Sequence, residues 1–232
     1  MAEPAGRTAL VAGGSGLVGA RLLPLLLNAS EYTRVHALSR RPLPLDHPRL
    51  ANRVVRFDES LATQIKGLQC QDAFCCLGTT IRDAGSREAF RAVDHDLVLE
   101  FARLALAAGA ERFVIVSAIG ADAASRNFYL RVKGESEQVL ESLRFRALDI
   151  MAPSLLLGAR RGLRPLELIV QGALWTLNPL LLGGWKRYRG IAAGTVAAAM
   201  LGAARSARRG VNRCGFDEMR TLAAAGMRAG AR

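Results

Sequence analysis

Lysine, histidine and cysteine are scarce in this chain of 232 residues. The three histidines, His36, His47 and His95, lie far apart and have no metal-ligand spacing, so we expect no metal site. The four cysteines form no C-x-x-C pair and no disulfide pattern. Two of them, Cys75 and Cys76, are adjacent within an apolar run, which predicts buried, reduced thiols in a cytoplasmic protein.

Aromatic residues are also few, at 6% of the chain, and only three of the 32 basic residues are lysines. Surfaces that bind nucleic acids combine clustered basic residues with aromatic stacking platforms. Here the arginines are scattered, so we expect no specific nucleic-acid partner despite a net charge of +12. A basic surface also suits small anionic ligands such as phosphorylated cofactors.

The sequence shows no secretory leader, internal repeat or low-complexity linker. Its length and its 50% hydrophobic content predict one domain with one sizeable core. Within that domain we expect residues 1–158 to form a nucleotide-binding core. Residues 159–232 are expected to supply a substrate-side lid and closing elements.

The most informative stretch is TALVAGGSGLVG, residues 8–19. It begins as an apolar, partly β-branched run typical of a buried strand and continues into a helix-compatible segment. Glycines allow a tight turn and close approach of a ligand, and the free N–H groups at a helix N-terminus attract anions. The turn is therefore predicted to bind nucleotide phosphates, the alternative being an ordinary tight turn. The residues expected to contact the cofactor here are Gly13, Ser15, Gly16, Leu17, Val18 and Gly19.

Short apolar runs alternate with helical patterns along most of the chain. Strands are expected at 8–12, 34–38, 53–57, 72–77, 112–117 and 146–151, and helices at 17–29, 86–109, 126–143 and 194–205. This alternation predicts an α/β protein, a single-domain Rossmann fold with a doubly wound parallel sheet and a small C-terminal helical and loop region. Such sheets bind ligands beyond the carboxyl ends of their strands, so residues directly after the strands are expected to surround one site.

A second feature is the sequence Tyr129-Leu-Arg-Val-Lys133, which places the phenol and the ammonium one turn apart on one helix face. A nearby cation lowers the pKa of a tyrosine from about 10. Such a phenol can exchange a proton with a carbonyl or alcohol oxygen during hydride transfer. We predict Tyr129 as acid/base, Lys133 as its partner and Ser117, at the end of the fifth strand, as the group that orients the same oxygen. Tyr129 and Lys133 are also expected to contact the cofactor, and the alternative is an exposed helical pair.

The second strand is followed by Ser39, Arg40 and Arg41, with no acid before Asp46. A carboxylate at this point would bind the ribose diol of NAD, whereas a guanidinium fork matches the 2′-phosphate of NADP. Arg40 and Arg41 therefore favour NADP(H) over NAD(H), unless both are solvated loop residues.

Two further segments follow predicted strands. The backbone of Leu77, Gly78, Thr79 and Thr80 is expected to approach the nicotinamide ribose. Asp58 is expected to accept a hydrogen bond from the adenine amino group, although a solvated loop acid would give the same pattern.

Together these residues resemble the atypical branch of the short-chain dehydrogenase/reductase superfamily. The turn GGSGLVG is similar to its G-x-x-G-x-x-G loop, and Ser117, Tyr129 and Lys133 are similar to its catalytic Ser/Tyr/Lys set. Three segments, AFCCLGTT (73–80), VSAIGAD (116–122) and FYLRVKGESE (128–137), resemble in this order the family of the human Tat-interacting-protein oxidoreductase and its bacterial relatives. The resemblance covers residues 8–158 well and the last third loosely. It implies a Rossmann fold that binds NADPH, with Pro153 among the cofactor-binding residues.

Two positions depart from the family pattern. Asp94 stands where many relatives have the Asn of a proton relay, which puts that relay in doubt. Ala152-Pro153 stands where the branch often has Arg-Pro, which leaves the polar contacts to the substrate open.

The uncharged stretch 168–185 is interrupted by Asn178-Pro179 and is a poor membrane span. We expect it to fold over the ligand site, favouring a small, apolar substrate; contact with a membrane surface is the alternative. The protein is expected to be a monomer or homodimer. Its expected function is NADP(H)-dependent hydride transfer to or from a carbonyl or alcohol, and the alternative is a non-catalytic NADPH-sensing regulator or scaffold.

Overall fold

The computed structural model describes residues 6–58, 60–157 and 189–228. Its strands are β1 (Arg7–Ala12), β2 (Tyr32–Ser39), β3 (Leu50–Val54), β4 (Asp72–Cys75), β5 (Arg112–Val116), β6 (Ala147–Met151), β7 (Leu155–Leu157), β8 (Gly190–Ala192) and β9 (Gly210–Cys214). Its helices are α1 (Gly19–Asn28), α2 (Leu61–Gln64), α3 (Ile81–Ala84), α4 (Arg87–Arg91), α5 (Leu97–Ala107), α6 (Phe128–Ser142), α8 (Ala193–Arg205) and α9 (Phe216–Arg228). A π-helical turn, Ala92–Asp96, joins α4 to α5.

Seven parallel strands form the main sheet, in the order β3-β2-β1-β4-β5-β6-β9. Leu10 in β1 pairs with His36 in β2 on one side and with Ala73 in β4 on the other. The chain runs outward from β1 to β3 and then in the opposite direction from β4, so the order reverses between β1 and β4. The predicted doubly wound Rossmann fold is therefore confirmed, and the reversal marks where such sheets bind ligands.

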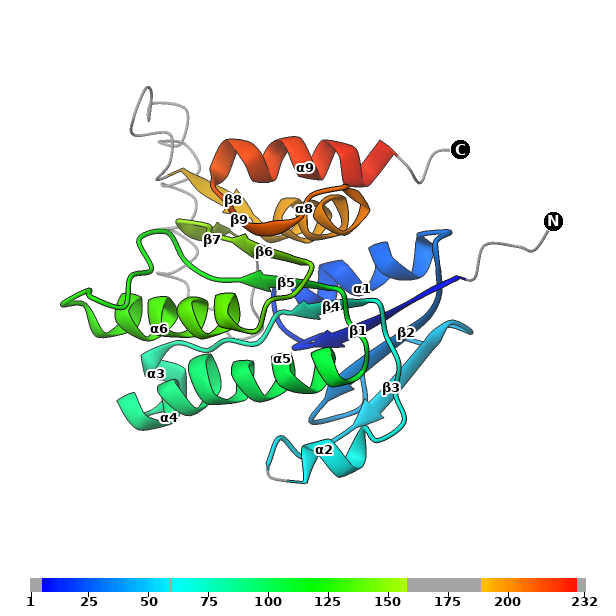
Figure 1. Ribbon diagram of the computed structural model, residues 1–232, viewed down its shortest axis with the longest axis horizontal. Helices are drawn as coiled ribbons and strands as arrows, with labels where there is room; N and C mark the ends of the chain where they lie inside the picture. Colours follow the sequence, from blue (N-terminus) through cyan, green and yellow to red (C-terminus); the bar gives the residue numbers. More distant parts are fainter. Residues whose placement is uncertain (1–5, 59, 158–188, 229–232) are drawn as a thin grey trace.

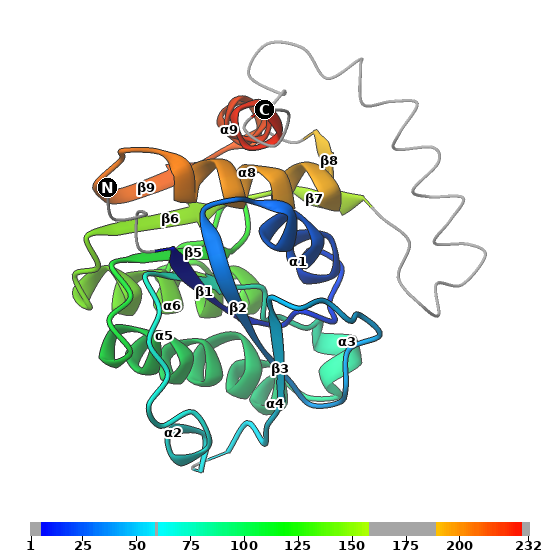
Figure 2. The same cartoon turned by 90° about the vertical axis from the view of Figure 1, so that its right-hand side faces the viewer.

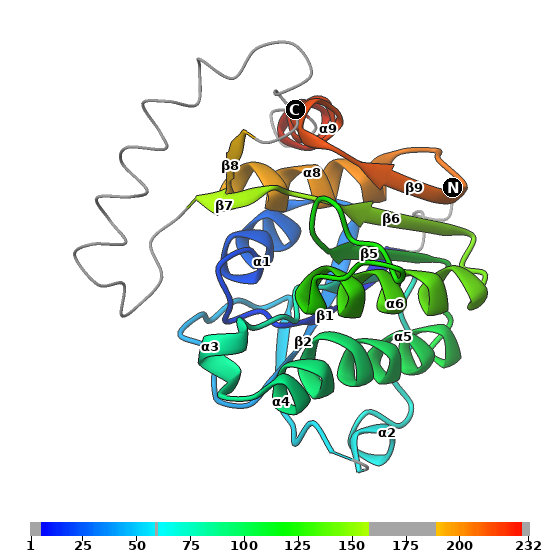
Figure 3. The same ribbon diagram turned by 90° about the vertical axis from the view of Figure 1, so that its left-hand side faces the viewer.

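Helices cover both faces of this sheet (Figure 1). On one face lie α1 and α8, and α9 lies outside α8; on the other lie α5 and α6 (Figure 3). Because successive side chains of a strand point to opposite faces, Ala9 and Val11 pack on the α1 and α8 side, and Leu10 and Ala12 on the α5 side. The sheet thus has an apolar core on each face.

The helices α8 and α9 lie next to each other (Figure 2), and their backbones approach closely at two glycines. A Cβ atom at Gly202 would lie 2.0 Å from the carbonyl oxygen of Leu222, and one at Gly226 would lie 2.3 Å from that of Ala198. Arg205 at the end of α8 pairs with Glu31 at 2.6 Å and donates to the carbonyl of Gly226. Small residues and one arginine therefore fasten the C-terminal helix to the core.

The third strand differs from its prediction at 53–57 and begins three residues earlier, at Leu50. It is the edge strand of the sheet, and its residues are half-buried or exposed. The β-branched pair Val54-Val55 suggested the strand, but the pairing of Leu50 with Val35 sets its register. The predicted helix 86–109 is also divided by the π-helical turn, although it ends as expected before Gly109, whose φ is +88°.

Candidate functional site

The glycine turn between β1 and α1 is built by close backbone contacts. Gly13 has a φ of +80°, and a Cβ atom there would lie 2.5 Å from the carbonyl carbon of Cys76 after β4. A Cβ at Gly19 would lie 2.2 Å from the oxygen of Gly13, so only glycine lets α1 begin this close to β1. Ser15 and Gly16 are exposed at the tip, Leu17 is half-buried, and Val18 is buried below them.

The first turn of α1 contains no acidic residue, and its N-cap, Val18, makes no side-chain hydrogen bond. A helix start of this kind leaves backbone N–H groups and the positive end of the helix dipole for an anion. The turn therefore combines a tight glycine backbone with an uncapped helix start.

The segment after β4 lies beside this turn, because Gly13 approaches the backbone of Cys76 and Leu77. Gly78 then lies above the charged pair of the site: a Cβ there would be 3.3 Å from Asp94 Oδ1 and 3.7 Å from Lys133 Nζ. Thr79 N–H donates to Asp94 Oδ2 at 2.8 Å, so this amide is already satisfied by the protein. Thr80 caps α3 by accepting from the amide of Asp83.

Lys133 is buried and forms an ion pair with Asp94, with 2.8 Å between Nζ and Oδ1. Burial alone would lower the pKa of Lys133, but the Asp94 carboxylate, with Tyr129 in addition, raises it above the usual lysine value. The ammonium therefore stays charged through the physiological pH range. Asp94 lies in the π-helical turn, a local distortion common at functional sites.

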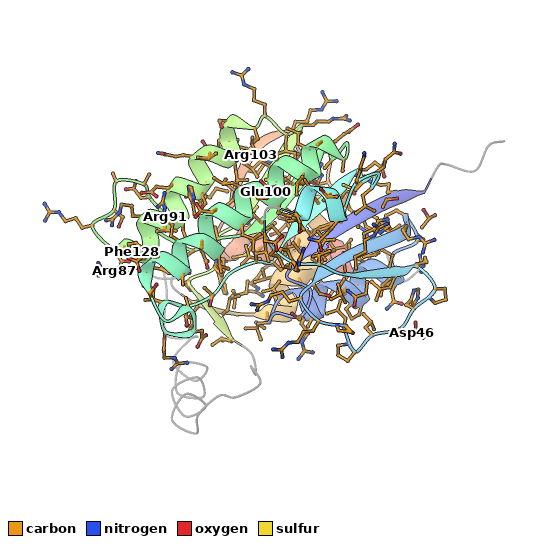
Figure 4. All side chains as sticks on the ribbon, turned by 90° about the horizontal axis from the view of Figure 1, so that it is seen from below. Asp46, Arg87, Arg91, Glu100, Arg103 and Phe128 are labelled. Atoms are coloured by element: carbon orange, nitrogen blue, oxygen red, sulfur yellow. The ribbon has the colours of Figure 1, made fainter. Side chains whose placement is uncertain are left out.

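Tyr129 is half-buried one turn before Lys133, and its ring packs against that of Phe90 with 5.5 Å between the centroids. The ring centroid of the neighbouring Phe128 lies 5.9 Å from that of Phe90, and the guanidinium of Arg87 lies over the Phe128 ring. Figure 4 shows Arg87 and Phe128 side by side where α4 meets α6. These contacts fix the start of α6, and with it the phenol, against α4.

Gly134 lets the loop after Ser117 pack directly on α6. A Cβ atom at this position would lie 2.2 Å from the backbone of Asp122 and Ala123. In addition, Asp122 N–H donates to the carbonyl of Leu130 at 3.1 Å. The loop is thereby held on the helix that carries Tyr129 and Lys133.

This contact yields a stability prediction. Gly134→Ala should lower the free energy of unfolding by about 1–3 kcal/mol, because a methyl group is forced into fixed backbone. Gly194→Ala in α8 is the matched control, since nothing lies within 4 Å of its added Cβ and alanine is the better helix former. Urea unfolding of both variants tests this, and equal stabilities would show that the loop tolerates displacement.

Ser117 follows β5 and is 5% exposed. Its amide donates to the carbonyl of Met151 at 2.7 Å, and its hydroxyl donates to Glu137 Oε1. Glu137 Oε2 pairs with Arg213 of β9. Neither Glu137 nor Arg213 was expected from the sequence; the one available signal was the position of Glu137 four residues after Lys133, on the same helix face.

Arg40 and Arg41 lie directly after β2, and both are exposed. The buried Ser39 hydroxyl donates to the carbonyl of Arg41 at 2.7 Å and accepts from Asn52 of β3 at 2.7 Å. Asn52, which sequence reasoning missed, thus anchors the arginine pair over the carboxyl end of β2. Asp46 lies farther along the loop from β2 to β3, at the edge of the molecule away from Phe128 (Figure 4).

The remaining predicted contacts follow β3 and β6. Asp58 is exposed and accepts from the amide of Ser60 at 2.9 Å, and the hydrogen bonds from Ser60 lower the pKa of its carboxyl group. The Pro153 carbonyl accepts from Ile119 N–H at 2.9 Å, which joins the loops after β5 and β6.

The structure therefore brings one set of predicted residues together at the carboxyl ends of β1, β4, β5 and β6. The glycine turn contacts Cys76 and Leu77, Gly78 approaches Lys133, and Ser117 is linked to the same helix. Arg40, Arg41 and Asp58 follow the neighbouring strands β2 and β3. Their roles toward a cofactor stay predictions.

Comparison with known proteins decides the family. Residues 13–153 match the family model described as NAD(P)H-binding. This chain belongs to that NAD(P)H-binding family. Within it, the chain is an atypical short-chain dehydrogenase/reductase close to HTATIP2.

Two relatives illustrate this placement of the NAD(P)H-binding protein. Protein HTATIP2 from Rattus norvegicus is 39% identical over 165 residues, covering 69% of this chain and 67% of the relative. A Coccidioides immitis protein named FMP52, mitochondrial, is 32% identical over 232 residues, covering 93% of both chains.

Solved structures resemble the NAD(P)H-binding protein in fold. MoeE5 in complex with UDP-glucose and NAD is 17% identical with a TM-score of 0.66, covering 94% of this chain and 81% of that one. The Helicobacter pylori ADP-L-glycero-D-manno-heptose-6-epimerase is 14% identical with a TM-score of 0.68, covering 94% and 80%. These likenesses agree with the Rossmann architecture.

The remaining predictions concern a segment and properties outside the candidate site. The stretch 168–185, with its lid and membrane-surface alternatives, lies outside the described residues. Among the helices that the structure describes, none combines the length and the apolar character needed to cross a membrane. The described residues likewise hold no group of three or more potential metal ligands, and the expected absence of a metal stays a prediction.

Proposed function

We propose that this protein is an NADP(H)-dependent oxidoreductase that acts on a carbonyl or alcohol group of a small molecule. The observation that carries the proposal is the Lys133–Asp94 ion pair beneath Gly78, near the glycine turn, with Tyr129 one helical turn before Lys133. The glycine turn supports the cofactor part of the proposal, because Gly13 and Gly19 let the backbone fold tightly at the start of α1, where helix N–H groups attract a phosphate.

The side chains divide the chemistry among them. A bound nicotinamide supplies or takes up the hydride. Tyr129 Oη gives its proton to the carbonyl oxygen in reduction and takes the hydroxyl proton in oxidation. Lys133, kept cationic by Asp94, places a positive charge one turn from Tyr129 on the same helix face. Ser117, directly after β5, orients the same substrate oxygen.

The composition of one segment indicates the class of substrate. The apolar stretch 168–185 favours an apolar substrate over a free sugar. We keep a cytoplasmic location and a monomer or homodimer as expectations. The fungal relatives are named mitochondrial, so fractionation of cells that express the tagged protein should include both compartments.

The first test is a titration with NADPH and NADH, followed by thermal shift. Ligands that bind the native state raise the melting temperature with concentration. Tight NADPH binding and weak NADH binding would support the cofactor proposal, whereas binding of neither would overturn it.

Arg40 gives the specific prediction for NADP(H). Arg40→Glu should weaken NADPH binding about 10- to 100-fold, the effect of losing a charge-assisted hydrogen bond to a phosphate, and leave NADH binding unchanged or improved. Arg34→Glu, at an exposed position earlier in β2, is the matched control for the change in charge. Equal losses for both variants would assign the effect to net charge alone.

A non-catalytic NADPH sensor is the second candidate. The observation that favours a sensor is the Lys133–Asp94 ion pair. The Lys133 ammonium binds the Asp94 carboxylate and is therefore not dedicated to the Tyr129 phenol. A sensor would bind NADPH and show no turnover with any carbonyl tested.

A further inference from the structure

Three polar side chains from different parts of the fold form a hydrogen-bonded network that runs from a buried serine to the surface. The Ser117 hydroxyl after β5 donates to Glu137 of α6, and Glu137 pairs with Arg213 of β9. Glu137 is 1% exposed, whereas the Arg213 side chain is 46% exposed. Arg213 also donates to the carbonyl of Ala121 at 3.3 Å, so the guanidinium covers the carboxylate at the surface.

The number of protons shared by Ser117 and Glu137 limits the hydrogen bonds that Ser117 can make. A serine hydroxyl has one proton to donate, and an ionised carboxylate can only accept. While Glu137 is ionised, the Ser117 proton is directed to it, and Ser117 can offer only lone pairs to a reacting oxygen. A protonated Glu137 can instead donate to Ser117 Oγ, which releases the serine proton for another acceptor.

The state of Ser117 matters for the hydride-transfer transition state. There the reacting oxygen carries negative charge, so a second donor beside Tyr129 stabilises it. Carbonyl reduction and alcohol oxidation pass through this same transition state, and the single hydroxyl proton of an alcohol goes to Tyr129, so a donating serine assists both directions.

The surroundings of Glu137 allow both protonation states. Burial raises the pKa of Glu137 above its usual value, whereas Ser117, Arg213 and Lys133 lower it and Glu141 raises it. These groups come from β9, from α6 and from the loop after β5. Because burial outweighs the two cations, the carboxyl group gains its proton at a higher pH than an exposed glutamate.

We propose that Glu137 is a positioning residue that sets whether the Ser117 hydroxyl is free to donate a second hydrogen bond to the reacting oxygen or is committed to the Glu137 carboxylate. The inference rests on the proposed oxidoreductase function, and it assigns Glu137 no contact with substrate or cofactor. Protonated Glu137 frees the Ser117 proton and speeds hydride transfer, and ionised Glu137 retains that proton and slows it.

Infrared difference spectroscopy of the free protein tests the coupling without any turnover. The wild-type protein should show a buried carboxylic-acid carbonyl band that disappears as the pH rises. This band should be absent in Glu137→Gln and retained in Glu141→Gln, the matched control one turn along α6. In Ser117→Ala its midpoint should move up by about one pH unit, because a hydrogen bond to the ionised form is lost.

The functional arm uses NADPH oxidation with para-nitrobenzaldehyde as the carbonyl probe. The wild-type kcat should fall through the same midpoint as the infrared band, and this pH dependence should be absent in Glu137→Gln. Equal midpoints in the wild type and Ser117→Ala, or a kcat profile that ignores the Glu137 midpoint, would overturn this inference alone. A wild-type protein that binds neither cofactor would overturn the proposed function and this inference with it.

Discussion

Tyr129→Phe is expected to lower kcat by about 10²- to 10⁴-fold, the usual contribution of a positioned general acid or base. NADPH affinity should change little, because the ring still packs on Phe90 and the Lys133–Asp94 ion pair does not involve the phenol oxygen. Steady-state kinetics with the aldehyde probe and thermal shift with NADPH measure the two effects separately.

The outcome separates the candidate functions. Loss of turnover with retained binding supports Tyr129 as the acid/base. Unchanged turnover would remove Tyr129 from the chemistry. A wild type that binds NADPH as tightly as Tyr129→Phe does and turns over no carbonyl would favour the sensor.

Gly16→Ala is expected to weaken NADPH binding about 10- to 100-fold while the protein stays folded. A Cβ at this exposed position would lie 3.2 Å from the oxygen of Gly13, a distance that a small shift can relieve. The added methyl group projects from the tip of the turn, where a diphosphate must approach the backbone, and a steric cost of about 1–3 kcal/mol corresponds to that loss of affinity.

Gly19→Ala provides the contrast, because its Cβ would lie 2.2 Å from the Gly13 oxygen. This variant should lose both thermal stability and cofactor binding, whereas Gly16→Ala should lose binding only. Isothermal titration with NADPH and differential scanning calorimetry distinguish them. Full NADPH affinity in Gly16→Ala would mean that the turn does not hold the phosphates.

Much of the fold was predictable because its signals are local. The central strands are short apolar runs buried on both sides, and the glycine turn follows the first of them without a gap. The edges of the sheet gave weaker signals. Residues 210–213 of β9 are exposed or half-buried, so no apolar run marks this strand, and pairing with β6 decides it. The α9 helix was not predicted from the sequence, although its pattern is helical. Its buried residues follow helical spacing: Met219, Leu222, Ala223 and Gly226.

The site was predictable to the extent that its residues lie in one helix or directly after a strand. Tyr129 and Lys133 are one turn apart, but the partner of Lys133 comes from the π-helical turn some forty residues earlier in the sequence. Asp94 was recognised only as a departure from the family pattern. Glu137 resembles an ordinary solvated acid in sequence, but it is 1% exposed and its partners, Ser117 and Arg213, come from distant parts of the chain.

The place of Arg213 near the end of the chain has a consequence for synthesis on the ribosome. The turn, the phenol and the ammonium are translated well before β9, and the first six strands of the main sheet can form without it. Until β9 emerges, however, Glu137 is a carboxylate without its guanidinium at an open edge of the sheet. The nascent protein is therefore expected to form its glycine turn early and the Ser117–Glu137–Arg213 network only after β9 has docked.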